Sequence, residues 1–357
     1  MKIWKLVGLG VGCLLLGMGI ALWVLSYPSA TREKATVAST AESPIEVLHK
    51  ECDQLEIYRE SNQELIRPFL LMDEECESPS LAILKEKIIQ KINTYKTEKR
   101  ITRSSVFFKY LNSLQWLGVD AHELYYPGSL NKVPMMIHIM KQSEENSKTL
   151  TEVLPLVKAP AMEQIVPSNA QLDPTKGYYV NDLLRMMIVR SDNDAAATLA
   201  QKVNVSAYGL MFNELGLTAL TGNSKDWNYQ ISAKDYSKFL RVLYNSTYLN
   251  RKNSIYCLDM LNHTEYKNGF LRFLPESQKC AHKFGERFTK GETTQFHESG
   301  IFYLGGKSYV LTVMTEGYSA DVLQQLLAEI SKICYDYVNA DKRSSRMTEN
   351  PEVIRQG

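Results

Sequence analysis

Apolar residues first recur with helical spacing just after Ser78-Pro79-Ser80, where serine and proline predict the start of a helix. One face of this helix is apolar and carries Leu81, Leu84, Ile88, Ile92 and Tyr95. The pattern then becomes strand-like at 105–111 and 115–119, with a short turn between the two runs. A helix followed by a hairpin is therefore expected near the beginning of the folded region.

The middle of the chain has a mainly helical pattern. The clearest helical periodicity occurs in five segments: 133–141, 180–189, 195–203, 233–244 and 254–261. β-rich runs return at 279–284, 295–304 and 308–315, and Gly305-Gly306 predicts a two-residue turn between the last two. An amphipathic helix is expected to follow at about 320–337.

The order of these elements predicts an α+β fold with three layers, α/β/α. Strands lie near both ends of the domain, so we expect one antiparallel sheet with helices on both faces. The domain would span 80–340, with a sheet part formed by 80–128 and 275–340 and an inserted all-helical part formed by 129–274. A cleft between the sheet edge and the helical part is the natural place for a site. The charged residues 341–357 are predicted to be disordered.

The N-terminal segment predicts a membrane anchor. Residues 6–25 carry no charge and would form a helix about 30 Å long, enough to span a bilayer. Lys2 and Lys5 precede this run and place the rest of the chain outside the cytoplasm. A cleaved signal peptide and a lipoprotein modified at Cys13 are the alternatives. We expect a single-pass transmembrane anchor at 1–27.

Residues 28–79 are predicted to connect the anchor to the domain. The first part is rich in Ser, Thr, Ala and Glu and is typical of a linker. The second part, 46–72, has a helical pattern and predicts a membrane-proximal helical extension.

Composition narrows the function classes. The chain has 41 Lys+Arg and 40 Asp+Glu, a net charge of +1, which argues against a nucleic-acid binder. A hydrophobic content of 44% is typical of a globular protein and not of a disordered one. Six cysteines are too few for a disulfide scaffold. Cys52 and Cys76 are the preferred pair, with buried free thiols as the alternative.

Three short motifs carry candidate chemistry. Ser129 and Lys132 lie three residues apart at the start of an apolar helix, so their side chains share a face. Residues 191–193, Ser-Asp-Asn, join the end of one predicted helix to the start of another. Residues 283–285, Lys-Phe-Gly, end a strand-like run. Each motif alone has an ordinary structural explanation as a helix cap or a turn.

Taken together and in this order, Ser-x-x-Lys, Ser-Asp-Asn and Lys-x-Gly resemble the signature set of class A β-lactamases and penicillin-binding proteins. The similarity extends over about 81–338, where 180–196 resembles the family's helix before Ser-Asp-Asn and 300–316 its final two strands. The chain is thus similar to the class A β-lactamase-like serine hydrolases. The resemblance implies the β-lactamase/transpeptidase-like fold and an acyl-enzyme mechanism.

The chemistry of these side chains agrees with such a mechanism. A serine hydroxyl needs a base, and Lys132 could take the proton of Ser129 if burial and the second cation Lys283 keep Lys132 neutral. Ser191 could relay a proton to a leaving nitrogen, and Asn193 could hydrogen-bond an amide of the substrate. Lys283 could also supply positive charge for a substrate carboxylate.

The resemblance also implies an oxyanion hole formed by the backbone N–H groups of Ser129 and Glu286, the residue after Gly285. We therefore expect Ser129, Lys132, Ser191 and Lys283 to be catalytic. Asn193, Gly285 and Glu286 are expected to bind the substrate.

The first departure from the family pattern is Phe284. It stands where the family usually has a hydroxyl residue that helps to bind the substrate carboxylate, which puts carboxylate recognition in doubt. Thr293, Thr294 and Arg287 are candidate replacements.

The second departure concerns deacylation. The segment 216–229 matches the family's Ω-loop but has no glutamate, the residue that activates the deacylating water in class A β-lactamases. Asp226 is the carboxylate in this loop and the candidate replacement. Glu214, just before the loop, is expected to be structural.

The histidines predict no metal site. The sequence has no His-x-His, His-Glu-x-x-His or Cys-x-x-Cys spacing. His282 should point to the face of its strand opposite to Lys283, whereas His297 is expected near the site. We expect neither a catalytic metal nor a cofactor.

The sequence therefore predicts a membrane-anchored, extracytoplasmic serine hydrolase with Ser129 as the nucleophile. Its expected substrates are β-lactams or the D-Ala-D-Ala-type peptides of peptidoglycan that they mimic, with slow deacylation. One alternative is a cell-wall D,D-peptidase, and another is a non-catalytic relative that binds peptidoglycan or a partner protein. A non-catalytic relative would have no need of all five of the polar residues Ser129, Lys132, Ser191, Asn193 and Lys283, whereas Phe284 argues for such a relative. No nucleic-acid partner is expected.

Overall fold

The computed structural model describes residues 55–61, 65–161, 164–168, 172–217, 229–288 and 293–340, and the backbone of 34–35 and 341–349. The predicted anchor at 6–25 and the loop residue Asp226 lie outside these ranges. None of the helices in the described part has the length and apolar character that a membrane crossing needs.

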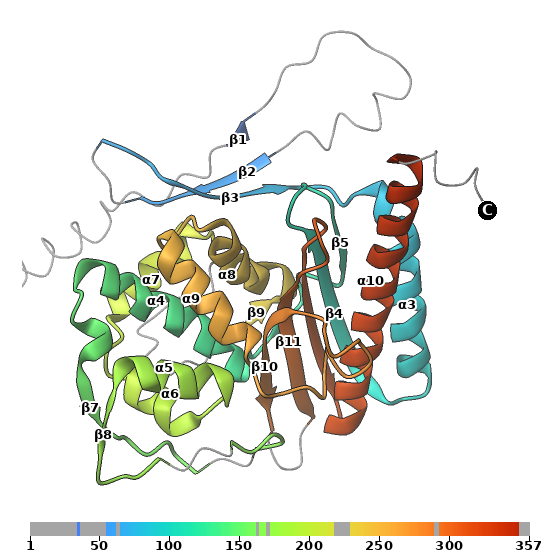
Figure 1. The fold of residues 1–357 in the computed structure, drawn as a ribbon. Helices are drawn as coiled ribbons and strands as arrows, with labels where there is room; N and C mark the ends of the chain where they lie inside the picture. The colour runs from blue at the N-terminus through green and yellow to red at the C-terminus, as the bar shows by residue number, and fades with distance from the viewer. Residues whose placement is uncertain are drawn as a thin grey trace, which may run out of the picture. The chain divides into compact units, whose positions relative to one another are not determined.

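The centre of the domain is a five-stranded antiparallel sheet with the strand order β10-β11-β12-β4-β5 (Figure 1). Two strands come from the start of the domain and three from its end: β4 (Ile101–Tyr110), β5 (Trp116–Val119), β10 (Cys280–Arg287), β11 (Thr294–Phe302) and β12 (Tyr309–Gly317). β12 pairs with β4, with Val313 opposite Val106, and this pairing joins the two halves. Gly305 and Gly306 have positive φ angles of 46° and 93° and form the turn predicted between β11 and β12.

Two helices cover one face of the sheet, α3 (Ala82–Thr97) and α10 (Ala320–Glu349) (Figure 1). The apolar face predicted for α3 is buried, and it packs with Phe108, Val313 and Leu327 in one core cluster. The prediction of a disordered tail from residue 341 is wrong for 341–349, which continue α10. Most residues of this stretch are good helix formers, and an established helix can elongate without an apolar face because each added residue gains a backbone hydrogen bond.

The opposite face carries the predicted helical part. It contains η2 (Gly128–Asn131), α4 (Lys132–Glu145), η3 (Thr149–Thr151), α5 (Val180–Val189), α6 (Asn193–Ala200), α7 (Val205–Glu214), α8 (Ala233–Asn245) and α9 (Arg251–Asn262). Helix α8 packs against β4 and β12, and α9 packs against β10. Two small sheets and one short helix complete the domain: β6 (Leu124–Tyr125) with β9 (Ile231–Ser232), β7 (Val153–Pro155) with β8 (Gly177–Tyr179), and η1 (Pro79–Leu81).

The predicted helix at 46–72 is wrong for the part that the structure describes. β2 (Leu55–Arg59) and β3 (Phe69–Glu74) form an antiparallel hairpin, and β1 (Lys34–Ala35) pairs with β2. Tertiary contacts stabilise this hairpin, and the local pattern of apolar residues gives no information about such contacts. Asp73 is buried, and its carboxylate lies 2.8 Å from Arg241 on α8 and 3.5 Å from Lys109 on β4.

The cysteines follow the prediction in part. Cys76 is disulfide-bonded, to a cysteine outside the described residues, and the predicted partner Cys52 lies outside them too. Cys257, Cys280 and Cys334 are free and buried.

Candidate active site

Two glycines bring the short helix η2, which carries Ser129, into backbone contact with strand β10. Gly128 has a φ of 54°, and a Cβ at this position would lie 2.2 Å from the carbonyl oxygen of Glu286. A Cβ at Gly285 would lie 2.3 Å from the carbonyl oxygen of Pro127. Only glycine allows this approach without displacement of the backbone. The Ser-x-x-Lys and Lys-x-Gly motifs therefore meet in space.

Lys132, at the start of α4, is almost fully buried and points toward the 191–193 turn. Its Nζ donates hydrogen bonds to the Ser191 carbonyl at 2.6 Å, to Ser191 Oγ at 3.1 Å and to Asn193 Oδ1 at 2.7 Å. Lys283 approaches the same turn from β10, and its Nζ donates to Ser191 Oγ at 2.8 Å and to the Phe284 carbonyl at 3.0 Å. The Oγ of Ser191 thus bridges two buried lysines, one from each side of the site.

The backbone of the 191–193 turn presents these acceptors. Ser191 has a φ of 57°, in the left-handed region that is uncommon for residues other than glycine. Asp192 caps α6, because its side chain accepts a hydrogen bond of 2.7 Å from the backbone N–H of Ala195. The 191–193 turn therefore caps α6, which is the purely structural role considered for this motif. The same turn also presents polar groups to both lysines.

Burial changes the proton affinity of both lysines. It lowers the pKa of Lys132 to about 7, although the charges of Asp192 and Glu286 act in the opposite direction. Burial, together with the charge of Lys132, also lowers the pKa of Lys283 well below its usual range. A substantial fraction of Lys132 is therefore neutral at neutral pH, which is the state that a general base needs.

The backbone of Glu286 faces η2. β10 is an edge strand, and the carbonyls of His282 and Phe284 accept bonds from Thr264 Oγ1 and Lys283 Nζ instead of from a neighbouring strand. Because backbone groups alternate along an antiparallel strand, the N–H of Glu286 has the same outward direction. It therefore lies on the side of Ser129, where the predicted oxyanion hole would form.

The side chain of Glu286 has a contact that the sequence did not predict. Its carboxylate accepts hydrogen bonds from the backbone N–H groups of Ile165 at 3.2 Å and Val166 at 3.0 Å. Burial raises the pKa of Glu286, while these bonds and the two lysines oppose the change. On the other side of the same segment, Ser168 Oγ donates to Asp192 at 3.0 Å. Residues 164–168 therefore connect β10 with the 191–193 turn.

Phe284 is part of the core on the α3 and α10 side of the sheet. Its ring packs against Tyr266, with centroids 4.5 Å apart, and stacks on Phe296 at 5.8 Å. The ring centroid also lies 3.8 Å from the Nζ of Lys283. The position that usually carries a hydroxyl therefore places an aromatic ring beside the lysine.

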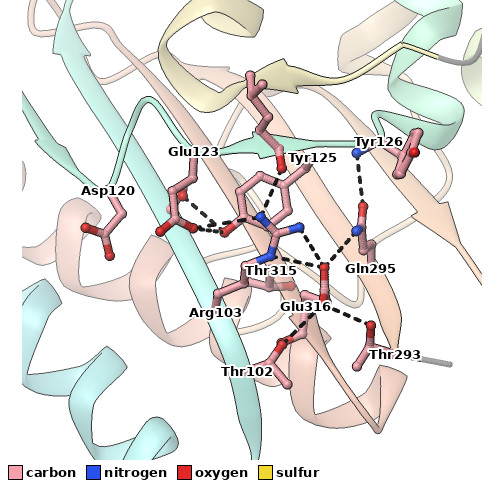
Figure 2. A network of polar contacts seen from close by, with 12 residues as sticks. Thr102, Arg103, Asp120, Glu123, Tyr125, Tyr126, Thr293, Gln295, Thr315 and Glu316 are labelled. Carbon is pink, nitrogen blue, oxygen red and sulfur yellow. Dashed lines mark hydrogen bonds and ion pairs between the residues drawn. The ribbon is translucent and has the colours of Figure 1, made fainter.

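The candidate replacements for that hydroxyl have other contacts. Thr293 donates to Glu316 at 2.9 Å, as Figure 2 shows, and Thr294 is buried. The guanidinium of Arg287 lies 3.6 Å from the centroid of the Tyr126 ring.

Two side chains of β11 hold the loop that leads to Ser129. His297 Nε2 lies 3.1 Å from the carbonyl oxygen of Tyr126, and its Nδ1 accepts a bond from the N–H of Thr315. Burial lowers the pKa of His297 to about 4, so the ring is neutral and donates from Nε2. Gln295 accepts from the N–H of Tyr126 at 3.1 Å and donates to Glu316 at 2.8 Å (Figure 2). His297 was expected near the site, whereas Gln295 was missed, although it shares the inward face of β11 with His297.

The other predicted residues lie away from this cluster. His282 points to the opposite face from Lys283, as expected, and its Nδ1 lies 2.6 Å from buried Glu298. Glu214 is buried and accepts hydrogen bonds from the N–H and Oγ of Ser61 at 2.8 and 3.0 Å, which is the structural role expected for it. Within the described ranges, no group of His, Cys, Asp and Glu side chains is arranged to hold a metal ion.

The fold and the sequence have counterparts among known proteins. The structure resembles a β-lactamase from Chitinophaga pinensis (TM-score 0.63, 17% identity, covering 72% of this chain and 99% of that one). It also resembles a class A β-lactamase from Bacteroides cellulosilyticus (TM-score 0.60, 17%, covering 72% and 99%). A third similar structure is an acyl-enzyme complex of a PBP-A mutant with penicillin G (TM-score 0.60, 19%, covering 73% and 97%). The predicted β-lactamase/transpeptidase-like fold is confirmed.

At the level of sequence, no curated protein gives a significant match. A family model, the beta-lactamase enzyme family, matches residues 85–338, which is more than half of the chain and contains all three motifs. The chain therefore belongs to the beta-lactamase enzyme family.

Proposed function

We propose that this protein is a serine hydrolase that forms an acyl-enzyme on Ser129 with β-lactams or with D-Ala-D-Ala-type peptides. The observation that carries the proposal is the position of Ser191 Oγ between Lys132 and Lys283, 3.1 and 2.8 Å from their Nζ atoms. This arrangement can move a proton between a nucleophile and a leaving group. A PBP-A mutant of the same fold forms an acyl-enzyme with penicillin G, which supports the same chemistry here.

The buried amine of Lys132 and the bridging hydroxyl of Ser191 support an acylation step on Ser129. Neutral Lys132 accepts the proton of Ser129 as Oγ bonds to the carbonyl carbon of the substrate. The N–H groups of Ser129 and Glu286 stabilise the oxyanion that develops. The carbon–nitrogen bond then breaks, and Ser191 passes a proton to the leaving nitrogen while a lysine restores the proton on Ser191. The products are an ester on Ser129 and an N–H on the leaving group.

Deacylation is proposed to be slow. It requires a base beside a water molecule at the ester carbonyl. Glu214 is hydrogen-bonded to Ser61 and belongs to the contact with the N-terminal hairpin. Asp226 is then the candidate base, with a side chain one methylene shorter than that of glutamate. Slow release of the acyl group from Ser129 would also suit a cell-wall D,D-peptidase. Such an enzyme shares the acylation step and is the second candidate function.

The catalytic domain is proposed to be extracytoplasmic and held at the membrane by residues 6–25. Lys2 and Lys5 before this uncharged run give the orientation. The disulfide at Cys76 supports an oxidising compartment, because disulfides are rare in the cytosol.

The nucleophile can be tested by covalent labelling with a fluorescent penicillin. Ser129→Ala should abolish labelling and leave the circular dichroism spectrum unchanged. Ser143→Ala is the matched control and should label normally, because Ser143 lies on α4, the helix that follows η2, and is hydrogen-bonded to the Met140 carbonyl. Full labelling of Ser129→Ala would refute the assignment of the nucleophile, and a wild type that never labels would favour the non-catalytic relative.

A further inference from the structure

The side of the site that would hold the leaving group lies beside Ser191, Lys283 and the ring of Phe284. In the acylation proposed above, the leaving nitrogen takes its proton from Ser191 Oγ and therefore lies beside Ser191. Lys283 Nζ is 2.8 Å from the same oxygen. The carboxylate of a penicillin is attached to the carbon next to the leaving nitrogen. It would consequently enter the space around Lys283 and Phe284.

Lys283 offers little to a bound carboxylate. Its side chain has no exposed surface, and its Nζ already donates to Ser191 Oγ and to the Phe284 carbonyl. The Phe284 ring, 3.8 Å away, covers the same nitrogen. The lowered pKa of Lys283 also weakens the Coulomb attraction that this amine can offer an anion.

Besides Lys283, the groups near Phe284 that bear on a bound anion are aromatic or acidic. The Tyr266 ring packs on Phe284, and its hydroxyl donates to Gln324 at 2.9 Å, so this donor is already engaged. Glu286, two residues after Phe284, is close enough for its charge to act on both Lys132 and Lys283. A second carboxylate at this place would lose water and meet a like charge.

We propose that Phe284 and Glu286 make this site selective for acyl donors whose group next to the leaving nitrogen is uncharged. The inference rests on the acylation function proposed above and narrows its substrates to neutral lactams or amides. It disfavours peptides that end in a free carboxylate. The bonds that form and break are those of the acylation step already described, and only the group beside the leaving nitrogen differs.

The test compares benzylpenicillin with its methyl ester, which differ in one charge. Adduct formation on the full chain is followed by intact-protein mass spectrometry. We expect the ester to acylate the wild type faster than the acid. Phe284→Thr supplies a hydroxyl and should raise the acid-to-ester rate ratio about tenfold, the effect of one hydrogen bond to a charged group. Phe284→Leu, which supplies none, should leave the ratio as it is.

A second variant acts on the charge instead of on the ring. Glu286→Gln keeps an acceptor for the N–H groups of Ile165 and Val166 and removes the charge, so it should raise the acid-to-ester rate ratio. Glu286→Gln therefore tests the proposed selectivity even if Phe284→Thr fails to fold. Acylation of the wild type by the acid at the same rate or faster would overturn the selectivity alone. An adduct from neither compound would overturn the acylation function together with the selectivity.

Discussion

The Nζ of Lys132 lies 3.1 Å from the Oγ of Ser191, although the two residues are 59 positions apart in the chain. This contact places a buried amine at the hydroxyl that also receives the hydrogen bond of Lys283. Proton transfer in the site therefore depends on which lysine holds a proton at a given pH.

The rate of acylation should rise with pH through about 7, the pKa of Lys132. Below this pH Lys132 is protonated and cannot accept the Ser129 proton, whereas above it the neutral base predominates. Adduct formation measured between about pH 5.5 and 9 should give this curve. Lys132→Arg, which stays protonated, should lower the plateau on the order of a hundredfold or more, and Lys141→Arg on the same helix should not. A flat profile would show that Lys132 is not the base.

Penicillin should acylate Ser129 faster than the adduct is released. The reason is the absence of the Ω-loop glutamate, since a base misplaced by about 1 Å can cost on the order of a hundredfold in rate. Mass spectrometry after mixing should show a persistent adduct of one penicillin per chain. Rapid turnover without an adduct would contradict this. Loss of that turnover in Asp226→Asn, but not in Glu214→Gln, would then identify the base.

Gly128→Ala should abolish labelling of Ser129. An added Cβ would come within 2.2 Å of the Glu286 carbonyl oxygen, and the φ of 54° is unfavourable for alanine, so η2 would have to move away from β10. The matched control is Gly209→Ala on α7, where a Cβ meets no atom within 4 Å. This control should label normally and gain about 0.5–1 kcal/mol of stability from helix propensity. Normal labelling of Gly128→Ala would show that the close contact is not required.

Asp73→Asn should lower the free energy of unfolding by about 3–5 kcal/mol, because Arg241 and Lys109 would be left buried without their anion. Burial alone would raise the pKa of Asp73, but Arg241 and Lys109 outweigh it and hold the pKa below its usual value. The wild type should therefore lose stability as the pH falls through that lowered pKa. Urea denaturation checks both statements. Lys176→Ala, which breaks the exposed pair with Asp173, should leave the midpoint unchanged.

The full-length chain should be recovered from cells in the membrane fraction. A chain that begins at Glu46 lacks the uncharged run 6–25 but retains the hairpin β2–β3 and should stay in the soluble fraction. Cell fractionation followed by immunoblotting separates the two. Soluble full-length protein with Met1 intact would contradict the anchor.

Periodicity was sufficient for the central sheet and most of its helices. The apolar face of α3 and the strands β10 to β12 were predictable because each buries one regular set of side chains against the core. The hairpin β2–β3 was not predictable, since it depends on a buried ion pair between Asp73 and the distant Arg241. Local pattern carries no information about such a partner.

The candidate site, like the fold, was predictable from the sequence only in part. The motif residues around Ser191 could be named from the order of three short motifs. The bond from Glu286 to Ile165 and Val166 could not, because it joins two segments without a shared pattern. The contact of the Phe284 ring with Lys283 was predictable only in part. The sequence shows phenylalanine in place of the family's hydroxyl residue, but it does not show where the ring points.

The pairing of β4 with β12 determines when the domain can fold. Arg103 and Glu316, which meet across these two strands, are 213 positions apart, and the central sheet cannot form until nearly the whole chain is available. The loop-closure entropy of such distant contacts slows folding relative to helical bundles of similar stability. A chain interrupted before Tyr309 would lack both β12, the strand that joins the two halves of the sheet, and the covering helix α10. Release of the C-terminal segment is therefore expected to set the start of productive folding.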